Sequence, residues 1–262
     1  MSAVLLHVSD LHVGAGPNLD TESLSSLREI VTEHRPQVLV ASGDLTHRNR
    51  SEQHEQAASL LRSLDVPIVA VPGNHDIPAL PPRRFTRTFE AFTDVWTELE
   101  PAHHSDGLSV VGLSSVRPWL YQEGLVTQQQ LQRLAREFSD HPDAARVVVM
   151  HHHLASAPWR TAKRPLLRRP KLLDAFSELE VDLVLAGHVH QSSAVAAAEF
   201  YVSLDTSVVA STTAGLGRPR PGRHAEVRGC QLWKIDATRL HCTTFSWIGE
   251  QLRSVGERLF PR

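Results

Sequence analysis

The sequence predicts a single α/β domain in which βα units come first and a β-rich segment comes last. Up to about residue 190, short apolar runs typical of buried strands alternate with segments that carry apolar residues at helical spacing. From residue 192, runs rich in Val, Thr and Ser are separated by Gly and Pro, which indicates short antiparallel strands. We expect one domain over residues 1–262, with the βα units in 1–190 and the β-rich part in 191–262.

The predicted strands of the βα part are apolar runs that end in turn residues or polar side chains. They lie at 3–8, 37–41, 66–71, 108–113, 146–150 and 181–186. The helices between them each have one apolar face and lie at 20–35, 51–64, 82–99 and 127–139, with a short one after residue 171. Pro36 ends the first helix, and Ser51 is a suitable N-cap for the second. The third carries three phenylalanines at helical spacing, which we assign to the core: Phe85, Phe89 and Phe92.

The composition is ordinary for a globular protein, apart from 16 histidines. Apolar residues make up 41% and charged residues 21% of the chain, and the net charge of −2 disfavours a long nucleic acid as a partner. Two cysteines, neither in a CxxC pair, are too few for a disulfide framework, so we expect a cytoplasmic, reducing location. No apolar run approaches the roughly 18 residues of a membrane helix, so no membrane partner is expected.

Side chains of the metal-ligand type follow five of the predicted strands. They are Asp10 and His12, then Asp44, then Asn74 with His75 and Asp76, then His151, and finally His188 and His190. In open α/β sheets, sites form beyond the carboxyl ends of the strands. If these strands lie parallel and side by side, the side chains therefore gather along one edge.

This set of side chains favours two metal ions rather than one. Asp, His and Asn together suit divalent ions of the Mn, Fe or Zn kind. Seven ligands are too many for one such ion once water must also bind, but they fit two ions that share a carboxylate. Such a pair holds a bridging hydroxide and clamps a phosphoryl group in line with it. Two aspartates and one hydroxide leave about one positive charge on the pair, which attracts a phosphoester anion.

The motifs and their order resemble those of the calcineurin-like metallophosphoesterase family. The matching segments are Asp10-x-His12, Gly43-Asp44, Gly73-Asn74-His75-Asp76, the His151 cluster and Gly187-His188-x-His190. The chain lacks the Asp-Arg-Gly of protein serine/threonine phosphatases. In length and motif style, it is similar to the small bacterial phosphodiesterases of the class III cyclic nucleotide type.

The resemblance implies a fold and a role for each residue. The fold would be a four-layer αββα sandwich with two mixed sheets, and the β-rich tail, 191–262, would supply its second half. Asp44 would bridge two metal ions, with His75 beside the leaving oxygen as an acid or as a hydrogen-bond donor to the transition state, and Asp76 orienting the His75 ring. The remaining ligands would divide between the ions: Asp10, His12 and His190 on one, and Asn74, His151 and His188 on the other.

Residues that contact the substrate are less well defined by the sequence. His152 is the fallback ligand beside His151, and we otherwise assign it to substrate binding. Residues 154–171 contain six basic side chains and no acidic one, which is typical either of a solvated basic loop or of a lid that steers an anion to the metals. In the second case Trp159 would stack on a flat group of the substrate and Arg160 would bind its charge.

The sequence therefore predicts a dinuclear metal-dependent phosphodiesterase acting on a small anionic phosphoester, of which a 3′,5′-cyclic nucleotide is one candidate. A nuclease or phosphomonoesterase of the same superfamily is the first alternative, although only about 70 residues follow His190 to form a nucleic-acid-binding cap. A non-catalytic metal-binding scaffold is the second, although the chain keeps every ligand and the acid histidine. A homodimer is compatible with the sequence.

Overall fold

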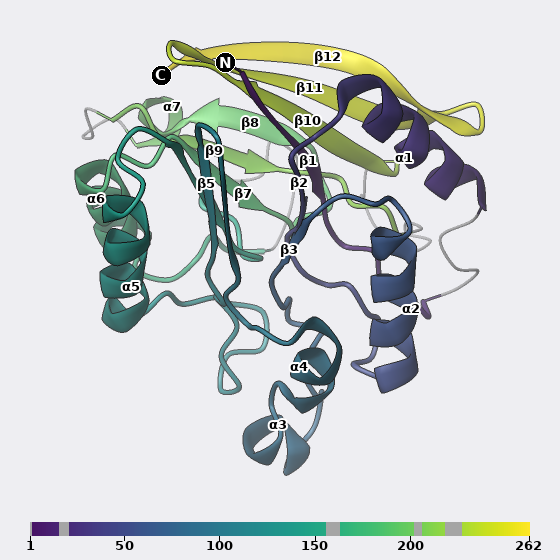
Figure 1. The fold of residues 1–262 in the computed structure, drawn as a ribbon. Helices are drawn as coiled ribbons and strands as arrows, with labels where there is room; N and C mark the ends of the chain where they lie inside the picture. The colour runs from purple at the N-terminus through teal and green to yellow at the C-terminus, as the bar shows by residue number, and fades with distance from the viewer. Residues whose placement is uncertain (1, 16–20, 156–162, 202–205, 218–226) are drawn as a thin grey trace.

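Two six-stranded β-sheets face each other, and helices cover the outer face of each (Figure 1). The computed structural model of the protein describes residues 2–15, 21–155, 163–201, 206–217 and 227–262. The first sheet has, in spatial order, β12 (Gln251–Pro261), β11 (Arg239–Ile248), β10 (Gly229–Ile235), β1 (Ala3–Val8), β2 (Val38–Ala41) and β3 (Ile68–Ala70). The second has β4 (Ala102–Ser105), β5 (Leu108–Gly112), β6 (Ala145–Val149), β7 (Leu183–Ala186), β9 (Val209–Thr212) and β8 (Ser193–Ala196).

The helices form the two outer layers of the sandwich. In Figure 1, α1 (Thr21–His34) and α2 (Ser51–Arg62) lie on one side, and α5 (Gln128–Ser139) and α6 (Arg169–Glu178) lie on the other. Three shorter helices complete the set: α3 (Arg83–Thr86), α4 (Glu90–Trp96) and α7 (Ala197–Phe200). None of the helices among the described residues is long and apolar enough to cross a membrane. The predicted four-layer αββα arrangement is therefore confirmed.

Three apolar clusters hold these layers together. The one between the sheets contains inward-facing residues of both, such as Val40 and Val147, which are fully buried. A second cluster joins α1 and α2 to the first sheet through Leu27 and Leu61. A third joins α5 and α6 to the second sheet, with Phe138 and Phe176 among its members. The central parallel strands of each sheet are thus buried on both faces, as expected for strands with largely apolar sequences, whereas β12 at the edge of the first sheet is mostly exposed.

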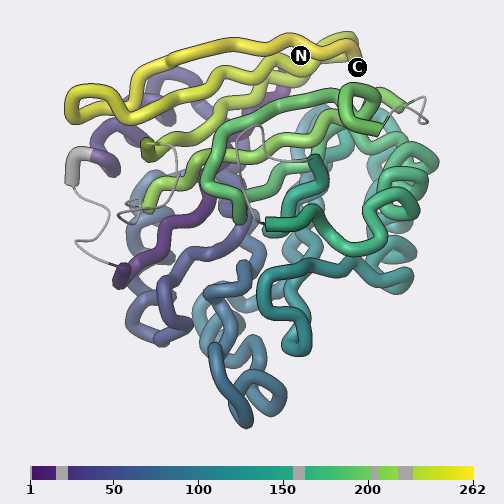
Figure 2. The backbone as a smooth tube through the Cα atoms, turned by 180° about the vertical axis from the view of Figure 1, so that it is seen from behind, coloured from purple at the N-terminus to yellow at the C-terminus, as the bar shows by residue number. Residues whose placement is uncertain are grey.

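The parallel strands place their carboxyl ends at one edge of the sandwich. β1, β2 and β3 are parallel to one another in the first sheet, and β5, β6, β7 and β9 are parallel in the second. Both views place the two termini at one end of the sandwich and α3 with α4 at the other (Figures 1 and 2). β1 begins at the end that holds the termini and runs toward the end that holds α3 and α4. Its carboxyl end, and the loop that follows it, therefore lie away from the termini.

The C-terminal strands do not form the second sheet that we expected from the tail. β10, β11 and β12 instead extend the first sheet, and β10 pairs with β1 in antiparallel fashion. Only β8 and β9 of the tail join the second sheet, which is built mainly from residues 102–186. Composition identified the tail as β-rich, but the choice of neighbouring strand depends on contacts far apart along the chain.

The prediction of one continuous helix over residues 82–99 is wrong. The segment is divided into α3 and α4 at Arg87, where φ is −142°. Phe92 is buried as expected, but Phe85 is 54% exposed. The side chain that turns inward from α3 is Arg84, whose guanidinium donates hydrogen bonds to the carbonyls of Pro78, Pro118 and Leu120. These hydrogen bonds, rather than apolar packing, set the orientation of α3.

Candidate metal centre

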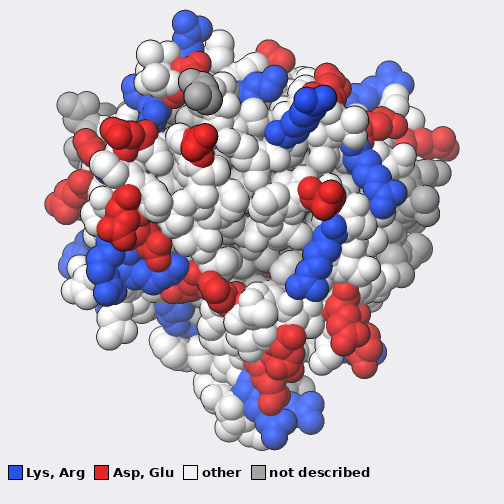
Figure 3. Space-filling view, viewed as in Figure 1, with Lys and Arg blue, Asp and Glu red and all other residues white. Residues whose placement is uncertain are grey.

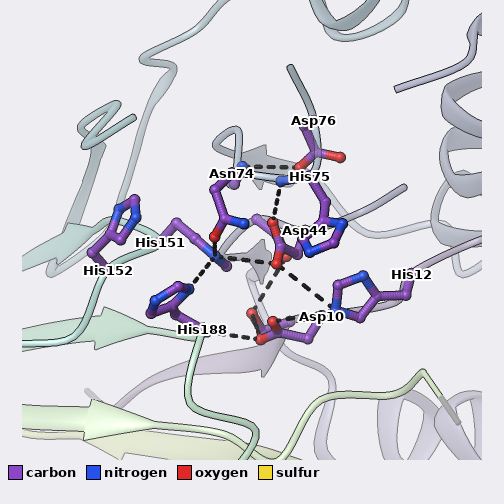
Figure 4. Close-up of polar contacts among 12 residues, drawn as sticks. Asp10, His12, Asp44, Asn74, His75, Asp76, His151, His152 and His188 are labelled. Carbon is purple, nitrogen blue, oxygen red and sulfur yellow. Dashed lines mark hydrogen bonds and ion pairs between the residues drawn. The ribbon is translucent and has the colours of Figure 1, made fainter. Parts of the chain in front are cut away.

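Loops from both sheets meet at the carboxyl ends of the parallel strands. Asp10, Asp44 and Asn74 follow β1, β2 and β3, whereas His151 and His188 follow β6 and β7. The Asp10 N–H donates to the Gly43 carbonyl over 2.9 Å, and the Gly187 N–H donates to the His151 carbonyl over 3.0 Å. The loops of neighbouring strands are therefore tied to each other by backbone hydrogen bonds. Figure 4 shows the resulting cluster of side chains, which point toward one another.

Asp44 lies at the centre of this cluster. Its Oδ2 is 3.4 Å from His151 Nε2 and 3.7 Å from His12 Nε2, so one oxygen faces ligands from both sheets. Its other oxygen, Oδ1, accepts a hydrogen bond of 2.8 Å from the His75 N–H. The side chain is 1% exposed. The carboxylate thus separates two groups of ligands, one on either side of it (Figure 4).

Asn74, His151 and His188, which we call the inner half, lie on one side of Asp44. His151 Nε2 is 3.2 Å from Asn74 Oδ1 and 3.2 Å from His188 Nδ1. The opposite ring nitrogen of His151, Nδ1, is 2.9 Å from the Ser42 carbonyl and donates its proton there. That hydrogen bond fixes the tautomer and leaves the lone pair of Nε2 directed into the cluster.

Asp10, His12 and His190, which we call the outer half, lie on the other side. The Nε2 atoms of His12 and His190 are 3.1 Å apart, and Asp10 Oδ1 is 3.1 Å from His190 Nε2. Asp10 Oδ2 is held in place by the Ser9 hydroxyl at 2.6 Å and by the His188 N–H at 3.0 Å. The second of these bonds links the two halves through the backbone.

Five of the seven predicted ligands have a left-handed backbone conformation: Asp10, His12, Asp44, His188 and His190, with φ between 46° and 72°. This region is unfavourable for side chains other than Gly and occurs mostly where surrounding structure enforces it. Glycines provide the space for the tight turns. A Cβ at Gly73 would overlap the Asp44 backbone, and one at Gly187 would overlap the Ser9 hydroxyl. The loops are therefore strained and closely packed around the cluster.

The carboxylates of the cluster are in the charged form that metal ligation requires. Burial alone would raise the pKa of Asp10 and of Asp44, but the adjacent histidines outweigh burial and lower both values. Burial lowers the pKa of His12 to about 4. For His151, burial acts in the same direction, but the carboxylate of Asp44 outweighs it and raises the pKa to about 9.

The residues present fit a pair of divalent cations. Asp10 Oδ1 is buried and has no hydrogen-bond partner among the described residues. Three groups of possible ligand atoms each lie within 4.8 Å of one another among the described residues: His12, His47 and His75 form one, and two further sets come from Asp10, His12, Asp44 and His190 and from Asp44, His151 and His188. Asp44 belongs to both of these further sets. Carboxylate and imidazole donors converging in this way are the ligands expected for Mn, Fe or Zn.

His75 lies beside the cluster, and its surroundings correct the expected role of Asp76. The ring nitrogen Nδ1 of His75 is 3.0 Å from the His47 carbonyl, to which it donates. Asp76 is fully buried and instead accepts from the N–H groups of Leu45, Thr46 and Gly73 and from the Thr46 hydroxyl, at 2.8–3.0 Å. Asp76 therefore fastens the loop after β2 to the loop after β3, and the His47 carbonyl orients the His75 ring.

His152 is also placed differently from the expectation. It is 1% exposed, its Nδ1 is 2.8 Å from the Ser115 hydroxyl, and its ring packs 4.7 Å from that of His188, so it is buried beside the inner half and not open to a substrate. Trp159 and Arg160, the other two predicted substrate contacts, lie outside the described residues. In the basic segment 154–171, Lys163 lies close to the site, since its amine donates a hydrogen bond to the His188 carbonyl.

Sequence reasoning missed two backbone groups that position this site. They are the carbonyls of Ser42 and His47, which orient the rings of His151 and His75. A backbone carbonyl has no residue-type signature, so no pattern of side chains identifies it.

Comparisons with known proteins agree with this geometry. The model of the calcineurin-like phosphoesterase family matches residues 3–192. The chain is 26% identical over 255 residues to a "Probable cyclic nucleotide phosphodiesterase" of Rhodococcus erythropolis, which covers 90% of this chain and 81% of that one. It is 24% identical over 206 residues to a "Probable glycerophosphodiester phosphodiesterase GpdQ" of Arcobacter nitrofigilis, covering 72% of each.

A solved structure shows the same fold. A dimetal phosphatase from Danio rerio aligns with a TM-score of 0.65 and 16% identity over 99% of this chain and 98% of that one. The matched family region contains every residue that the motifs singled out, from Asp10 to His190. The resemblance inferred from the motifs is confirmed, and the chain belongs to the calcineurin-like phosphoesterase family.

Proposed function

We propose that the protein hydrolyses small phosphodiesters with the help of two divalent metal ions. The observation that carries this proposal is the position of Asp44, whose Oδ2 faces His12 on one side and His151 on the other. A carboxylate shared by two buried ligand sets is an arrangement for two adjacent ions rather than for one.

Each half of the cluster would hold one ion. Asp10, His12 and His190 would bind the first, and Asn74, His151 and His188 the second, with Asp44 shared between them. Mn, Fe and Zn all suit these donors, and metal analysis of the purified protein would identify the ions that it binds. When bound, the ions supply a strong nucleophile from water at neutral pH and neutralise charge on the phosphoryl oxygens.

His75 would donate the proton that the leaving oxygen needs. Its backbone N–H is fixed on Asp44, and its Nδ1 proton is fixed on the His47 carbonyl, so only Nε2 is left to face a substrate. The ring is 4.8 Å from that of His12, which places it at the edge of the outer half. A protonated imidazole at this position can give its Nε2 proton to an alkoxide as the phosphorus–oxygen bond breaks.

A small diester is the substrate class that these features favour. The names of both curated relatives describe phosphodiesterases, one for cyclic nucleotides and one for glycerophosphodiesters. The face seen in Figure 3 carries Lys and Arg interspersed with Asp and Glu, without a continuous band of one sign among the described side chains. Binding a long nucleic acid would require such a band of positive charge.

The test is a comparison of substrates with the Mn²⁺-loaded protein. Bis(p-nitrophenyl) phosphate should be hydrolysed faster than p-nitrophenyl phosphate, and 3′,5′-cyclic AMP and glycerophosphocholine should compete with it. Faster hydrolysis of the monoester, or a preference for single-stranded DNA over every small diester, would contradict the proposal. Binding of metal without turnover of any ester would instead indicate a scaffold.

A further inference from the structure

An open groove begins at His75 and runs away from the metal cluster. It encloses about 550 Å³, and the lining residues that matter here are Asn74, the histidines His47 and His75, the arginines Arg48, Arg50 and Arg84, and Tyr121. This volume is in the range of pockets that bury a ligand of nucleotide size. Because Asn74 and His75 form its inner end, a group that occupies the groove must be attached to the reacting phosphorus on the side that faces His75. On the proposed function, that group is the leaving group.

The lining of this groove is cationic. It includes three arginines and two histidines, and no carboxylate belongs to its described lining. Arg48 and Arg50 are exposed, and no carboxylate among the described residues forms an ion pair with either. Arg84 differs from them, because the residue is 2% exposed and its guanidinium already donates to three carbonyls. Two arginines are therefore left to bind an anion beyond the reacting phosphate.

The groove also contains a rigid aromatic surface. The Tyr121 ring lies 4.3 Å from the carbon of the Arg84 guanidinium, a cation–π contact that supports one face of the ring. The hydrogen bonds of Arg84 to Pro118 and Leu120 fix the turn just before Tyr121. Tyr121 is nevertheless 59% exposed. A supported but exposed ring is suited to stacking against a nucleobase.

We propose that this groove is a leaving-group subsite for a nucleotide, whose base stacks on Tyr121 and whose phosphate pairs with Arg48 and Arg50. The inference rests on the proposed function, because the groove belongs to the leaving group only if His75 protonates the leaving oxygen. The substrate class is then a short linear nucleotide diester with a phosphate on the departing nucleotide. In its hydrolysis, water supplies the oxygen to phosphorus, the bond from phosphorus to O3′ of the departing nucleotide breaks, and O3′ takes the proton.

Two dinucleotides that differ by one phosphate test the role of the arginines. They are adenylyl-(3′→5′)-adenosine and the same molecule with a 5′-phosphate on the departing adenosine. We expect the kcat/KM of the phosphorylated substrate to be about 10-fold or more above that of the other. The Arg48→Gln/Arg50→Gln double variant should abolish this ratio. The Arg136→Gln/Arg253→Gln double variant removes two exposed arginines from α5 and β12 and should preserve it.

The role of the ring is tested on the same two substrates. Tyr121→Ala should raise KM for both about 10-fold or more, with a smaller change in kcat, whereas Tyr121→Phe should retain the affinity of the original protein. Trp119 is 61% exposed on the same turn but does not line the groove, so Trp119→Ala is the matched control. Equal losses in the Tyr121→Ala and Trp119→Ala variants would overturn the stacking role.

A binding measurement separates this inference from the proposed function. Adenosine 5′-monophosphate should bind the purified protein more tightly than adenosine does in isothermal titration calorimetry, and the two groove variants should each lose about 10-fold in affinity. If diesters are hydrolysed but the arginine and tyrosine variants change neither the substrate ratio nor this affinity, the subsite is wrong and the phosphodiesterase stands. If no diester is hydrolysed, the affinities of the variants still decide whether the groove binds a nucleotide.

Discussion

The two halves of the metal cluster have similar ligands but are held with different rigidity. In the inner half, His151 and His188 are completely buried, and the Ser42 carbonyl fixes the His151 ring. In the outer half, the side chains of His12 and His190 are 10% and 25% exposed. Each half has one buried ring nitrogen without a hydrogen-bond partner among the described residues, His12 Nδ1 in the outer half and His188 Nε2 in the inner half, so the difference lies in burial and in the Ser42 contact. A ligand that is oriented before the ion arrives loses less conformational freedom on binding, so the inner half should bind its ion more tightly.

This difference suggests separate tasks for the two halves. The rigid inner half would provide a permanent ion, whereas the outer half lies next to His75 and to the groove that a substrate would enter. Exchange of the outer ion would then change activity without unfolding the site. Four measurements test whether the halves differ in this way, and they are given in decreasing order of the change expected.

The largest effect should come from Asp44→Ala, which removes the ligand that both halves share. We expect hydrolysis of bis(p-nitrophenyl) phosphate to fall to background and the metal content, measured by mass spectrometry, to drop below two ions per chain. Asp94→Ala, which removes an exposed carboxylate on α4, is the control and should leave both quantities unchanged. Full activity with two ions retained in the Asp44 variant would show that the halves do not share a bridging ligand.

His75→Ala should have the next largest effect, because it removes the proposed proton donor but none of the proposed ligands. We expect kcat to fall about 10²–10⁴-fold with metal content near that of the original protein. The loss should be smaller with p-nitrophenolate as the leaving group than with an alkoxide, because p-nitrophenolate needs little protonation. Loss of one ion from this variant would instead make His75 a ligand of the outer half.

Asp76→Ala should destabilise the loops that carry ligands of both halves. The substitution leaves the buried N–H groups of Leu45, Thr46 and Gly73 without their acceptor. We expect the free energy of unfolding in urea to fall by about 2–4 kcal/mol. Asp174→Ala on α6, where the carboxylate is exposed, should change it by less than about 0.5 kcal/mol. If Asp76→Ala instead lowered kcat at unchanged stability, Asp76 would act on His75 after all.

The smallest expected effect is a difference in the affinities of the two ions. During titration with a chelator, one ion should leave at a concentration about 10-fold or more below that needed to remove the second. His190→Ala should eliminate the weaker step only, whereas His151→Ala should eliminate the tighter one. A single step that removes both ions together, in the original protein and in the His190 variant, would contradict the unequal rigidity of the halves.

Residue types and local spacing were sufficient to predict the position of the cluster. Each strand before a ligand is a largely apolar run, and each ligand follows where that run stops, as for Asp10 after Val8 or His188 after Ala186. Parallel strands buried on both faces have this pattern, so their polar carboxyl ends are visible in the sequence. The expected gathering of Asp10, Asp44 and His188 therefore required only that the strands be adjacent.

Features that depend on long-range contacts could not be predicted in this way. Phe85 has the spacing of a core residue, yet three distant carbonyls capture Arg84 and turn the other face of α3 inward. His152 has the same chemistry as His151, but only the packing of its ring against Ser115 removes it from the site. In both cases, the hydrogen-bond partner that sets the side chain's orientation lies more than five residues away along the chain. Helical or strand periodicity does not report such contacts.

The order of the elements, the ligand types at the strand ends and the family could all be predicted from residue types and spacing. The pairing of β10–β12 with the first sheet, the unequal burial of the two halves and the place of Tyr121 in the groove at His75 became apparent in the folded molecule. The physical reason is that side-chain chemistry and periodicity are local properties of the chain. The partner of a backbone carbonyl or of an aromatic ring is set by which distant segments pack together.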